Sequence, residues 1–154
     1  MDFDSIDSPT DCALIVCFCD ATDFAKVCQR KSSNEMFELM SRYFELAGDT
    51  VEPAGGRIVK FLGDGMFVVF PEDRAKQAIE ALKELQRKVA RLFREQGFEC
   101  ALRVKAHIGP VTCGLVGTRN DKRFDVFGDH VNSTARLQGG DFSISPELQE
   151  DVSS

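Results

Sequence analysis

The sequence predicts an α+β domain with a mostly antiparallel sheet and helices on one face. Three observations indicate this class: apolar runs of strand length recur, two long segments repeat apolar residues at helical spacing, and a glycine-rich turn joins two strands directly. Their order is strand, helix, hairpin, helix, several strands, short helix and strand, which is typical of α+β proteins. The chain has 154 residues, 43% of them hydrophobic, and this suits one domain with a single core.

A buried strand and an amphipathic helix are predicted first. Residues 12–20 (CALIVCFCD) form a nearly continuous apolar run that ends in Asp20, as expected of a strand buried on both faces. The helix that follows has Ser33 as a candidate N-cap and Gly48 as a candidate stop. Its apolar residues recur at intervals of three and four: Met36, Phe37, Met40, Tyr43, Phe44 and Ala47.

Residues 55–70 predict a hairpin closed by the glycine-rich turn GDG. In its first strand, positions 58, 60 and 62 share one face and positions 59 and 61 share the other. All are apolar except Lys60, and a lysine on an apolar strand face requires an explanation. Because helices cover only one face, we expect a second copy of the chain to cover the other, which gives a dimer whose interface holds Lys60.

The second half of the chain begins with the longest predicted helix, which ends before Gly97. One face of this helix is apolar: Ala75, Ile79, Leu82, Leu85, Val89, Leu92 and Phe93. The remaining predicted elements are a strand at 100–109, a further segment at 111–117, a polar loop at 118–123, a strand at 123–128, a helix from Asp129 to the Gly139–Gly140 pair, and a strand at 141–145.

Charge and cysteine content exclude several classes of protein. The formal net charge of −6 leaves no basic footprint for duplex nucleic acid. None of the six cysteines forms a CxxC pair, and Cys17 and Cys19 lie two apart in an apolar strand, as small buried hydrophobes do. This usage suits a reducing compartment, so we expect the domain in the cytoplasm.

The ends of the chain and its apolar runs bear on domain organisation. No apolar run approaches the roughly 20 residues that span a bilayer, and the N-terminus is not a signal peptide. We therefore expect no direct membrane insertion of this domain, whether the whole protein is soluble or membrane-attached. Residues 1–10 suggest a tail or linker remnant, and residues 11–152 the folded domain.

Two carboxylates are candidates for a metal site. Asp20 ends the first strand and Asp64 lies at the tip of the hairpin. If the first strand pairs beside the hairpin, the two side chains come close together, and paired carboxylates suit a hard divalent cation. The alternative is structural: Asp64 is a turn residue and Asp20 caps a loop.

The segment FDVFGDHVNSTARLQGG carries a second group of polar candidates. Asn132 and Arg136 lie four residues apart, so their side chains leave one face of the predicted helix. They could hold a phosphate and a sugar oxygen, or they could lie on a solvated helix face. Asp125, just upstream, could form an internal ion pair with Lys60, or both could read the edge of a base.

Taken in order, four segments resemble the catalytic domain of class III nucleotidyl cyclases. FCDATDFA is similar to the first metal segment of the family, and GGRIVKFLGDGMFVVF to the second. RVKAHIGPVTCGLVG resembles the strand pair that follows, and RFDVFGDHVNSTARL the nucleotide segment. The resemblance covers about Ala13 to Ser145 and implies the ferredoxin-like cyclase fold, active as a dimer.

The resemblance implies a metal and phosphate site in one chain. Asp20 and Asp64, with the backbone carbonyl of Ala21, would bind two ions of Mg²⁺ or Mn²⁺. Backbone N–H groups near Phe24 and Ala25, where the chain turns into a helix, would bind phosphate.

The resemblance also implies that the partner chain completes the site. Lys60 and Asp125 would recognise the base, Asn132 would orient the ribose, and Arg136 would stabilise the phosphates in the transition state. A symmetric homodimer would then carry two sites. ATP is the implied substrate, and a covalently attached regulatory or sensor domain is the implied partner in the full-length protein.

The predicted activity is that of an adenylyl cyclase, which converts ATP to 3′,5′-cyclic AMP and pyrophosphate. A lysine donor and an aspartate acceptor match the N1 and N6 edge of adenine, whereas guanylyl members of the family have other residues there. The alternatives are a guanylyl cyclase and a catalytically silent nucleotide-binding or dimerisation module. Two positions depart from the family pattern: Asp23 replaces a usual glycine, and His130 a common threonine.

Overall fold

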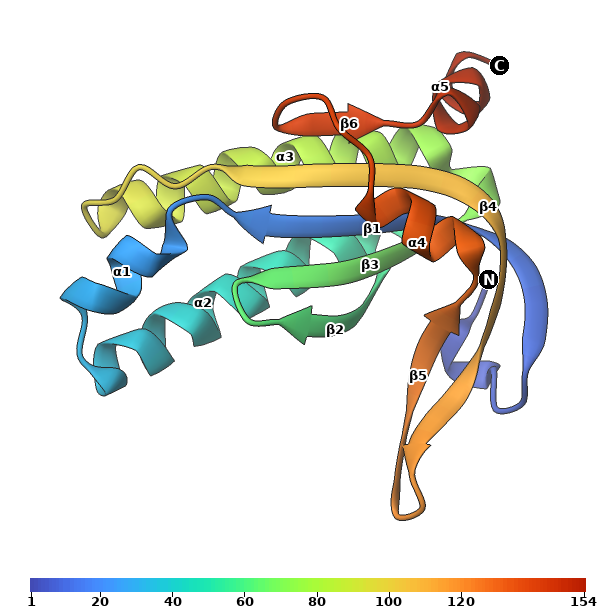
Figure 1. The fold of residues 1–154 in the computed structure, drawn as a ribbon, viewed down its shortest axis with the longest axis horizontal. Coiled ribbons are helices and arrows are strands. Elements are labelled where there is room, and N and C mark those ends of the chain that lie inside the picture. The colour runs from blue at the N-terminus through green and yellow to red at the C-terminus, as the bar shows by residue number, and fades with distance from the viewer.

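The computed structural model describes residues 1–154 and contains one six-stranded sheet (Figure 1). The strands are β1 (Thr10–Ala21), β2 (Arg57–Leu62), β3 (Gly65–Pro71), β4 (Leu102–Thr118), β5 (Asp121–Phe127) and β6 (Phe142–Ile144). The α-helices are α1 (Phe24–Arg30), α2 (Ser33–Val51), α3 (Ala75–Glu95), α4 (Asp129–Ala135) and α5 (Pro146–Ser153). Short 3₁₀ turns occupy Phe3–Ser5, Glu52–Ala54 and Glu72–Arg74.

The sheet follows the order β2-β3-β1-β4-β5, and β6 pairs with β4. Every pairing is antiparallel except that of β4 with β6, which is parallel. The predicted α+β class with a mostly antiparallel sheet is therefore confirmed. The first strand does pair beside the hairpin, as the metal-site interpretation required.

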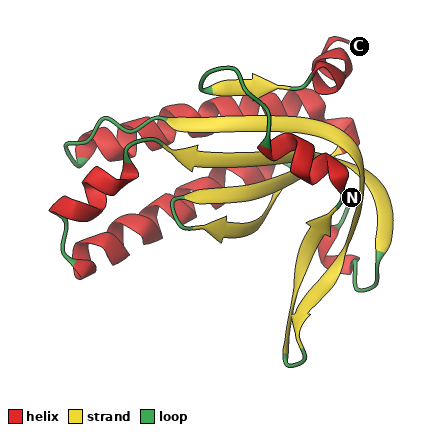
Figure 2. Ribbon diagram, in the orientation of Figure 1, coloured by secondary structure: helices red, strands yellow, loops and turns green.

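The main hydrophobic core lies between the sheet and the helices α2 and α3, which both lie on one side of it (Figure 2). It contains 26 buried residues. Every position predicted on the apolar face of α3 is buried there, and so are Cys17 and Cys19 on β1. All six cysteines are free thiols. None of the helices is long and apolar enough to cross a membrane.

Helix α2 differs from its prediction at both ends and on its buried face. Ser32, not Ser33, is the N-cap, because its hydroxyl accepts from the Glu35 N–H while the Glu35 carboxylate accepts from the Ser32 N–H. The helix continues past Gly48 to Val51, which is buried in the core. Phe37 is 77% exposed, and Leu39 takes the buried position instead.

The predicted face pattern of β2 is wrong because a β-bulge interrupts the strand between Ile58 and Lys60. Ile58 and Phe61 both pack against the main core, whereas Val59 packs on the opposite side of the sheet. Lys60 is in register with Phe67, which belongs to that opposite side. The bulge therefore places Lys60 on the face without α2 and α3.

Segments of the same chain cover part of the second face, which the prediction assigned to a second copy. A cluster of nine buried residues lies there, formed by β1, β3, β4, β5 and the N-terminal turn. Phe3 from that turn is buried against the ring of Phe124, and Asp4 pairs with Arg57. Arg57 also lies over the Phe124 ring at 5.0 Å. Within residues 1–10, the segment interpreted as a tail or linker remnant, Phe3 and Asp4 thus contact the domain.

The segments predicted at 100–109 and 111–117 form one strand, β4, which bends and continues into a projecting hairpin with β5 (Figure 1). We call residues 112–127 the arm. Helix α4 follows the arm, lies in front of the sheet in this view, and ends at Ala135 rather than at the Gly139–Gly140 pair. Arg136 is its C-cap residue.

Candidate active site

A pair of carboxylates lies where β1 ends beside the β2–β3 turn. Asp20 is paired in register with Arg103 on β4, while Asp64 occupies the two-residue turn between β2 and β3. The Asp64 carboxylate accepts a hydrogen bond of 3.2 Å from the N–H of Ala21, the residue after Asp20. The structure therefore brings together the three residues predicted for the metal site.

The surroundings of Asp64 hold the turn in place. Gly63 has a left-handed φ of 64°, which a glycine adopts without strain. A Cβ on Gly65 would lie 2.7 Å from the carbonyl oxygen of Cys19, so this glycine allows the turn to approach β1 closely. The Tyr43 hydroxyl on α2 donates to the Asp64 carbonyl at 2.8 Å, and burial raises the pKa of Tyr43, so this donor stays protonated.

The oxygen donors here fit a divalent cation. Mg²⁺ is commonly bound through one or two carboxylates, with substrate phosphates supplying further oxygens. No group of three or more His, Cys, Asp and Glu side chains is suitably placed for a metal ion in this chain. The carboxylate pair therefore suits an ion that arrives with a phosphate ligand rather than one held by protein side chains alone.

Arg103 is a component of this site that the sequence analysis missed. Its guanidinium donates to the Asp20 carboxylate at 2.8 Å, and the two side chains are each about half exposed. This hydrogen bond, together with the Asp20 charge, raises the pKa of Arg103. The alternation of β4 could have indicated it. Arg103 and Lys105 lie two residues apart and therefore share one face of the strand, opposite the apolar residues between and beside them.

The predicted phosphate cradle lies at the start of α1. Phe24 and Ala25 are its first two residues, so their N–H groups have no acceptor within the helix. Asp23 is the N-cap residue in the left-handed conformation, with φ of 55°. This conformation explains why glycine suits the position, although aspartate tolerates it better than most residues.

Lys60 and Asp125 form an ion pair of 3.0 Å between β2 and the arm. Asp125 is largely enclosed, with 16% of its side chain exposed, while 47% of Lys60 is exposed. The second carboxylate oxygen of Asp125 accepts from the Val126 N–H at 2.8 Å. Of the two interpretations left open by the sequence, the internal ion pair is present in the isolated chain.

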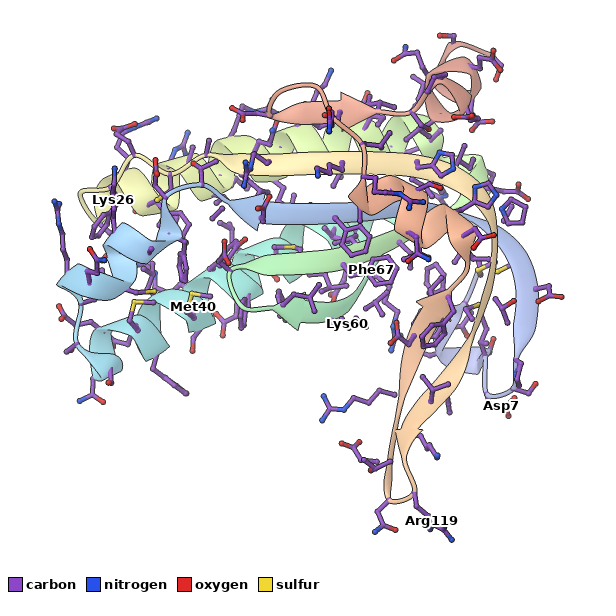
Figure 3. The ribbon with its side chains drawn as sticks, viewed as in Figure 1. Asp7, Lys26, Met40, Lys60, Phe67 and Arg119 are labelled. Carbon is purple, nitrogen blue, oxygen red and sulfur yellow. The ribbon has the colours of Figure 1, made fainter.

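A groove of about 770 Å³ surrounds this ion pair. Its walls come from α2, β2 and the arm, and they include Phe44, Val59, Phe61 and Thr118. Figure 3 shows Lys60 at the hairpin and Arg119 at the far tip of the arm. The groove thus combines apolar side chains with the Lys60–Asp125 pair and with further polar groups, among them Glu52 and Arg123, a mixture found in ligand sites.

Asn132 and Arg136 lie on α4, on the open side of the sheet. Both are exposed, and neither side chain makes a hydrogen bond or ion pair within the chain. Nothing links them to Asp20 or Asp64 of the same chain. The structure therefore joins the predicted metal residues to one another, and Lys60 to Asp125, but leaves Asn132 and Arg136 free.

This antiparallel sheet, with an acidic pair at one strand end and an Asn/Arg helix on the open face, defines a class III nucleotidyl cyclase domain. The sequence profile described as "Adenylate and Guanylate cyclase catalytic domain" matches residues 7–144. The chain belongs to this family.

Relatives and solved structures agree with this assignment. The chain is 28% identical over 134 residues to the terminal-differentiation specific adenylate cyclase of Dictyostelium discoideum, covering 82% of this chain and 6% of that protein. The adenylyl cyclase CyaB from P. aeruginosa superimposes with a TM-score of 0.86 at 22% identity, over 95% of this chain and 83% of the other. The guanylyl cyclase Cya2 gives 0.82 at 24% identity, over 93% and 79%. The chain therefore spans only a small part of the Dictyostelium relative.

Proposed function

We propose that this domain is an adenylyl cyclase that converts ATP to 3′,5′-cyclic AMP and pyrophosphate at sites shared between two copies of the chain. The observation that carries the proposal is the division of polar groups within one chain. Asp20 and Asp64 lie together, whereas Asn132 and Arg136 have no partner. A second copy that brings its α4 to the carboxylate pair would complete a site that one chain leaves incomplete.

The proposed reaction is an intramolecular displacement. The 3′-oxygen of the ribose forms a bond to the α-phosphorus, the bond from that phosphorus to the pyrophosphate oxygen breaks, and the hydroxyl proton leaves to solvent. Asp20, Asp64 and the Ala21 carbonyl would hold two ions of Mg²⁺ or Mn²⁺. When bound, these ions lower the pKa of the 3′-hydroxyl and neutralise the leaving pyrophosphate.

The chain's own residues would position the substrate and stabilise charge. Asn132 orients the ribose, and Arg136 donates to the phosphate oxygens as negative charge develops on them. The N–H groups of Phe24 and Ala25 bind the phosphates at the start of α1. Catalysis then rests on positioning and electrostatics, with no covalent intermediate.

Selection of adenine would come from Lys60 and Asp125. The ammonium donates to N1 and the carboxylate accepts from the N6 amino group, so the ion pair has to open to admit the base. Guanine presents an acceptor and a donor in the reverse order and would leave both charged groups mismatched. Phe44, Val59 and Phe61 in the groove around the pair offer apolar surface against which a purine ring can pack.

A dimer is supported by apolar side chains exposed on the arm. Leu115 is 44% exposed, Val116 42% and Phe127 55%. Exposed apolar residues gathered on one projecting element are typical of a protein–protein contact. A symmetric homodimer that buries the arm would contain two sites.

A covalently attached regulatory or sensor domain is part of the proposal for the full-length protein. The supporting observation is length, because the chain covers 6% of the Dictyostelium relative and 20% of adenylate cyclase 1 of Rhizobium meliloti.

The decisive experiment is turnover by the purified chain with ATP or GTP, in Mg²⁺ or Mn²⁺, over a range of protein concentrations. We expect cyclic AMP from ATP, little product from GTP, and a specific activity that rises with protein concentration as dimers form. A preference for GTP would favour a guanylyl cyclase, which the Cya2 likeness keeps as the second candidate. No turnover by a proven dimer would favour the silent nucleotide-binding module.

A further inference from the structure

Helix α4 is fastened to β4 through two histidines that the proposed reaction does not use. The ring nitrogens Nε2 of His107 and Nδ1 of His130 are 2.8 Å apart. The two rings stack at 21°, with 5.0 Å between their centroids. His107 is buried on β4, at 6% exposure, and His130 is the second residue of α4.

The strand is shaped to receive this helix. Gly109 lies directly under His130, and a Cβ there would be 2.4 Å from Nδ1 of the ring. At the other end of α4, Lys105 donates to the carbonyl of Ala135 at 2.9 Å, a favourable place for a cation at a helix C-terminus. Alternate residues of one strand, Lys105, His107 and Gly109, thus hold both ends of the helix that carries Asn132.

The same contact extends to α5. Nδ1 of His107 lies 2.7 Å from the hydroxyl oxygen of Ser145, which is the N-cap of α5 and accepts from the Leu148 N–H at 3.3 Å. The carboxylate of Glu147 lies 3.7 Å from the same Nδ1. The groups that act electrostatically on His107 are therefore His130 from α4 and Glu147 from α5, while β1 presents the apolar Val16.

A hydrogen bond between two imidazole nitrogens needs one proton between them. Two neutral rings satisfy this in either tautomeric arrangement, with one ring donating and the other accepting. One added proton is also tolerated, because a charged ring can donate to a neutral one. A second proton leaves two donors and two positive charges facing each other, so the bond is lost.

We propose that His107 and His130 are positioning residues, which fix α4 so that Asn132 and Arg136 leave it in the productive direction, and that full protonation of the pair releases this helix. The inference rests on the proposed function for its catalytic consequence, but the fastening of α4 can be measured without turnover. Activity would then fall at low pH because the hydrogen bond between His107 and His130 is lost.

The sign of the pH effect follows from the burial of His107. Burial lowers the pKa of His107, the charge on His130 lowers it further, and Glu147 opposes both. A histidine with a depressed pKa stabilises the fold above its unfolded value of about 6.5. That contribution is lost as the pH falls below about 6.5 and through the lower folded value, which is where α4 should loosen.

The structural test measures amide hydrogen exchange of the purified chain between pH 5 and 8, expressed as protection against intrinsic exchange. We expect α4 amides to lose protection below the ordinary histidine pKa, while α2 amides keep theirs. The ¹⁵N signals of the His107 imidazole should show the loss of its neutral form over the same range. Equal changes in α4 and α2, or none in α4, would overturn the proposal.

The kinetic test compares His130→Ala, His130→Asn and Ser133→Ala. Misplacement of catalytic groups costs up to about 100-fold in rate, so we expect His130→Ala to lower kcat by about 10- to 100-fold with little change in KM. His130→Asn keeps a polar atom near the place of Nδ1 without titrating, so it should restore most of kcat and shift the acid limit. Ser133→Ala, an exposed change on the same helix, is the matched control.

The outcomes separate the two proposals. If His130→Ala matches Ser133→Ala in both kcat and α4 protection, the positioning role is wrong while the cyclase proposal stands. If the wild-type chain turns over neither ATP nor GTP, the cyclase proposal fails, and α4 protection alone decides the positioning role. If His130→Ala does not fold, the wild-type pH series decides it.

Discussion

The two faces of the sheet differ in composition, although the same strands form both: one face packs in the main core and the other carries the polar residues of the candidate site. On β1, Cys17 and Cys19 point into the 26-residue core, while Asp20 between Cys19 and Ala21 points to the open face. On β4, Leu102, Val104 and Ala106 are in the core, and the residues between them are charged or titratable. Phe67 and Lys60 in Figure 3 mark the open face.

Residues that stabilise the main core and residues of the proposed site therefore alternate along β1 near Asp20 and along β4. A substitution at one position should affect mainly folding, and one at the next position mainly activity. The open face has its own smaller cluster of nine buried residues. The separation between effects on folding and effects on activity should therefore be sharp on β1 and β4 near Asp20 and weaker toward the arm.

The strongest test of the open face uses Asp20→Ala and Arg136→Ala. Each change should lower turnover by about 10²- to 10³-fold, because it removes charge stabilisation, while thermal unfolding changes little. Turnover and melting temperature are measured on the same samples. Co-expressed as a mixture, the two variants should recover about a quarter of wild-type activity, since half the dimers have one intact site. No recovery by a proven heterodimer would contradict a shared site.

The helix-covered face is tested by Leu82→Ala on α3. Leu82 is fully buried in the main core, so the cavity should lower the free energy of unfolding by about 3 kcal/mol. Urea denaturation measures this loss. Activity per folded molecule at low temperature should stay near wild type. A large drop in kcat of the folded fraction would contradict the claim that this face affects mainly folding. Lys83→Ala, the next residue on the helix, is the control.

The base-reading pair is tested by Lys60→Glu combined with Asp125→Cys. The double change removes the donor and the acceptor proposed for adenine, and we expect the ATP-over-GTP ratio of kcat/KM to fall by about 10- to 100-fold. Competition between the two nucleotides measures the ratio directly. An unchanged preference would show that other residues select the base.

The smallest effect is expected at the start of α1. Asp23 has φ of 55°, so Asp23→Gly should relieve strain and raise the free energy of unfolding by about 0.5 kcal/mol. Asp23→Val should instead destabilise, because a β-branched residue tolerates this conformation poorly. Chemical denaturation of both variants against wild type checks the order.

Much of the fold could be predicted from the sequence because the apolar periodicity of β1 and α3 is strong. The errors lie where tertiary contacts override local signals. Gly48 does not stop α2, since Thr50 and Val51 still pack, and the bulge that turns Lys60 to the open face leaves no local signature in an apolar strand.

The candidate site was predictable in part for the same reason. Asp20 and Asp64 follow a strand and occupy a turn, so pairing of adjacent strands was enough to bring them together. Arg103 and the pair His107–His130 were missed as site components, because their partners lie on segments 83 and 23 residues away in the sequence. The register of β4 with β1 shows that Arg103 lies opposite Asp20, and the packing of α4 on β4 shows that His107 meets His130.

The packing of Phe3 has a mechanical consequence. Its ring packs against Phe124, the residue that precedes Asp125. Asp4 forms an ion pair with Arg57, which lies three residues before Lys60. A displacement of the start of the chain would therefore act first on β2 and β5, the two strands that carry the Lys60–Asp125 ion pair. The N-terminal turn thus contacts both strands that carry the Lys60–Asp125 pair.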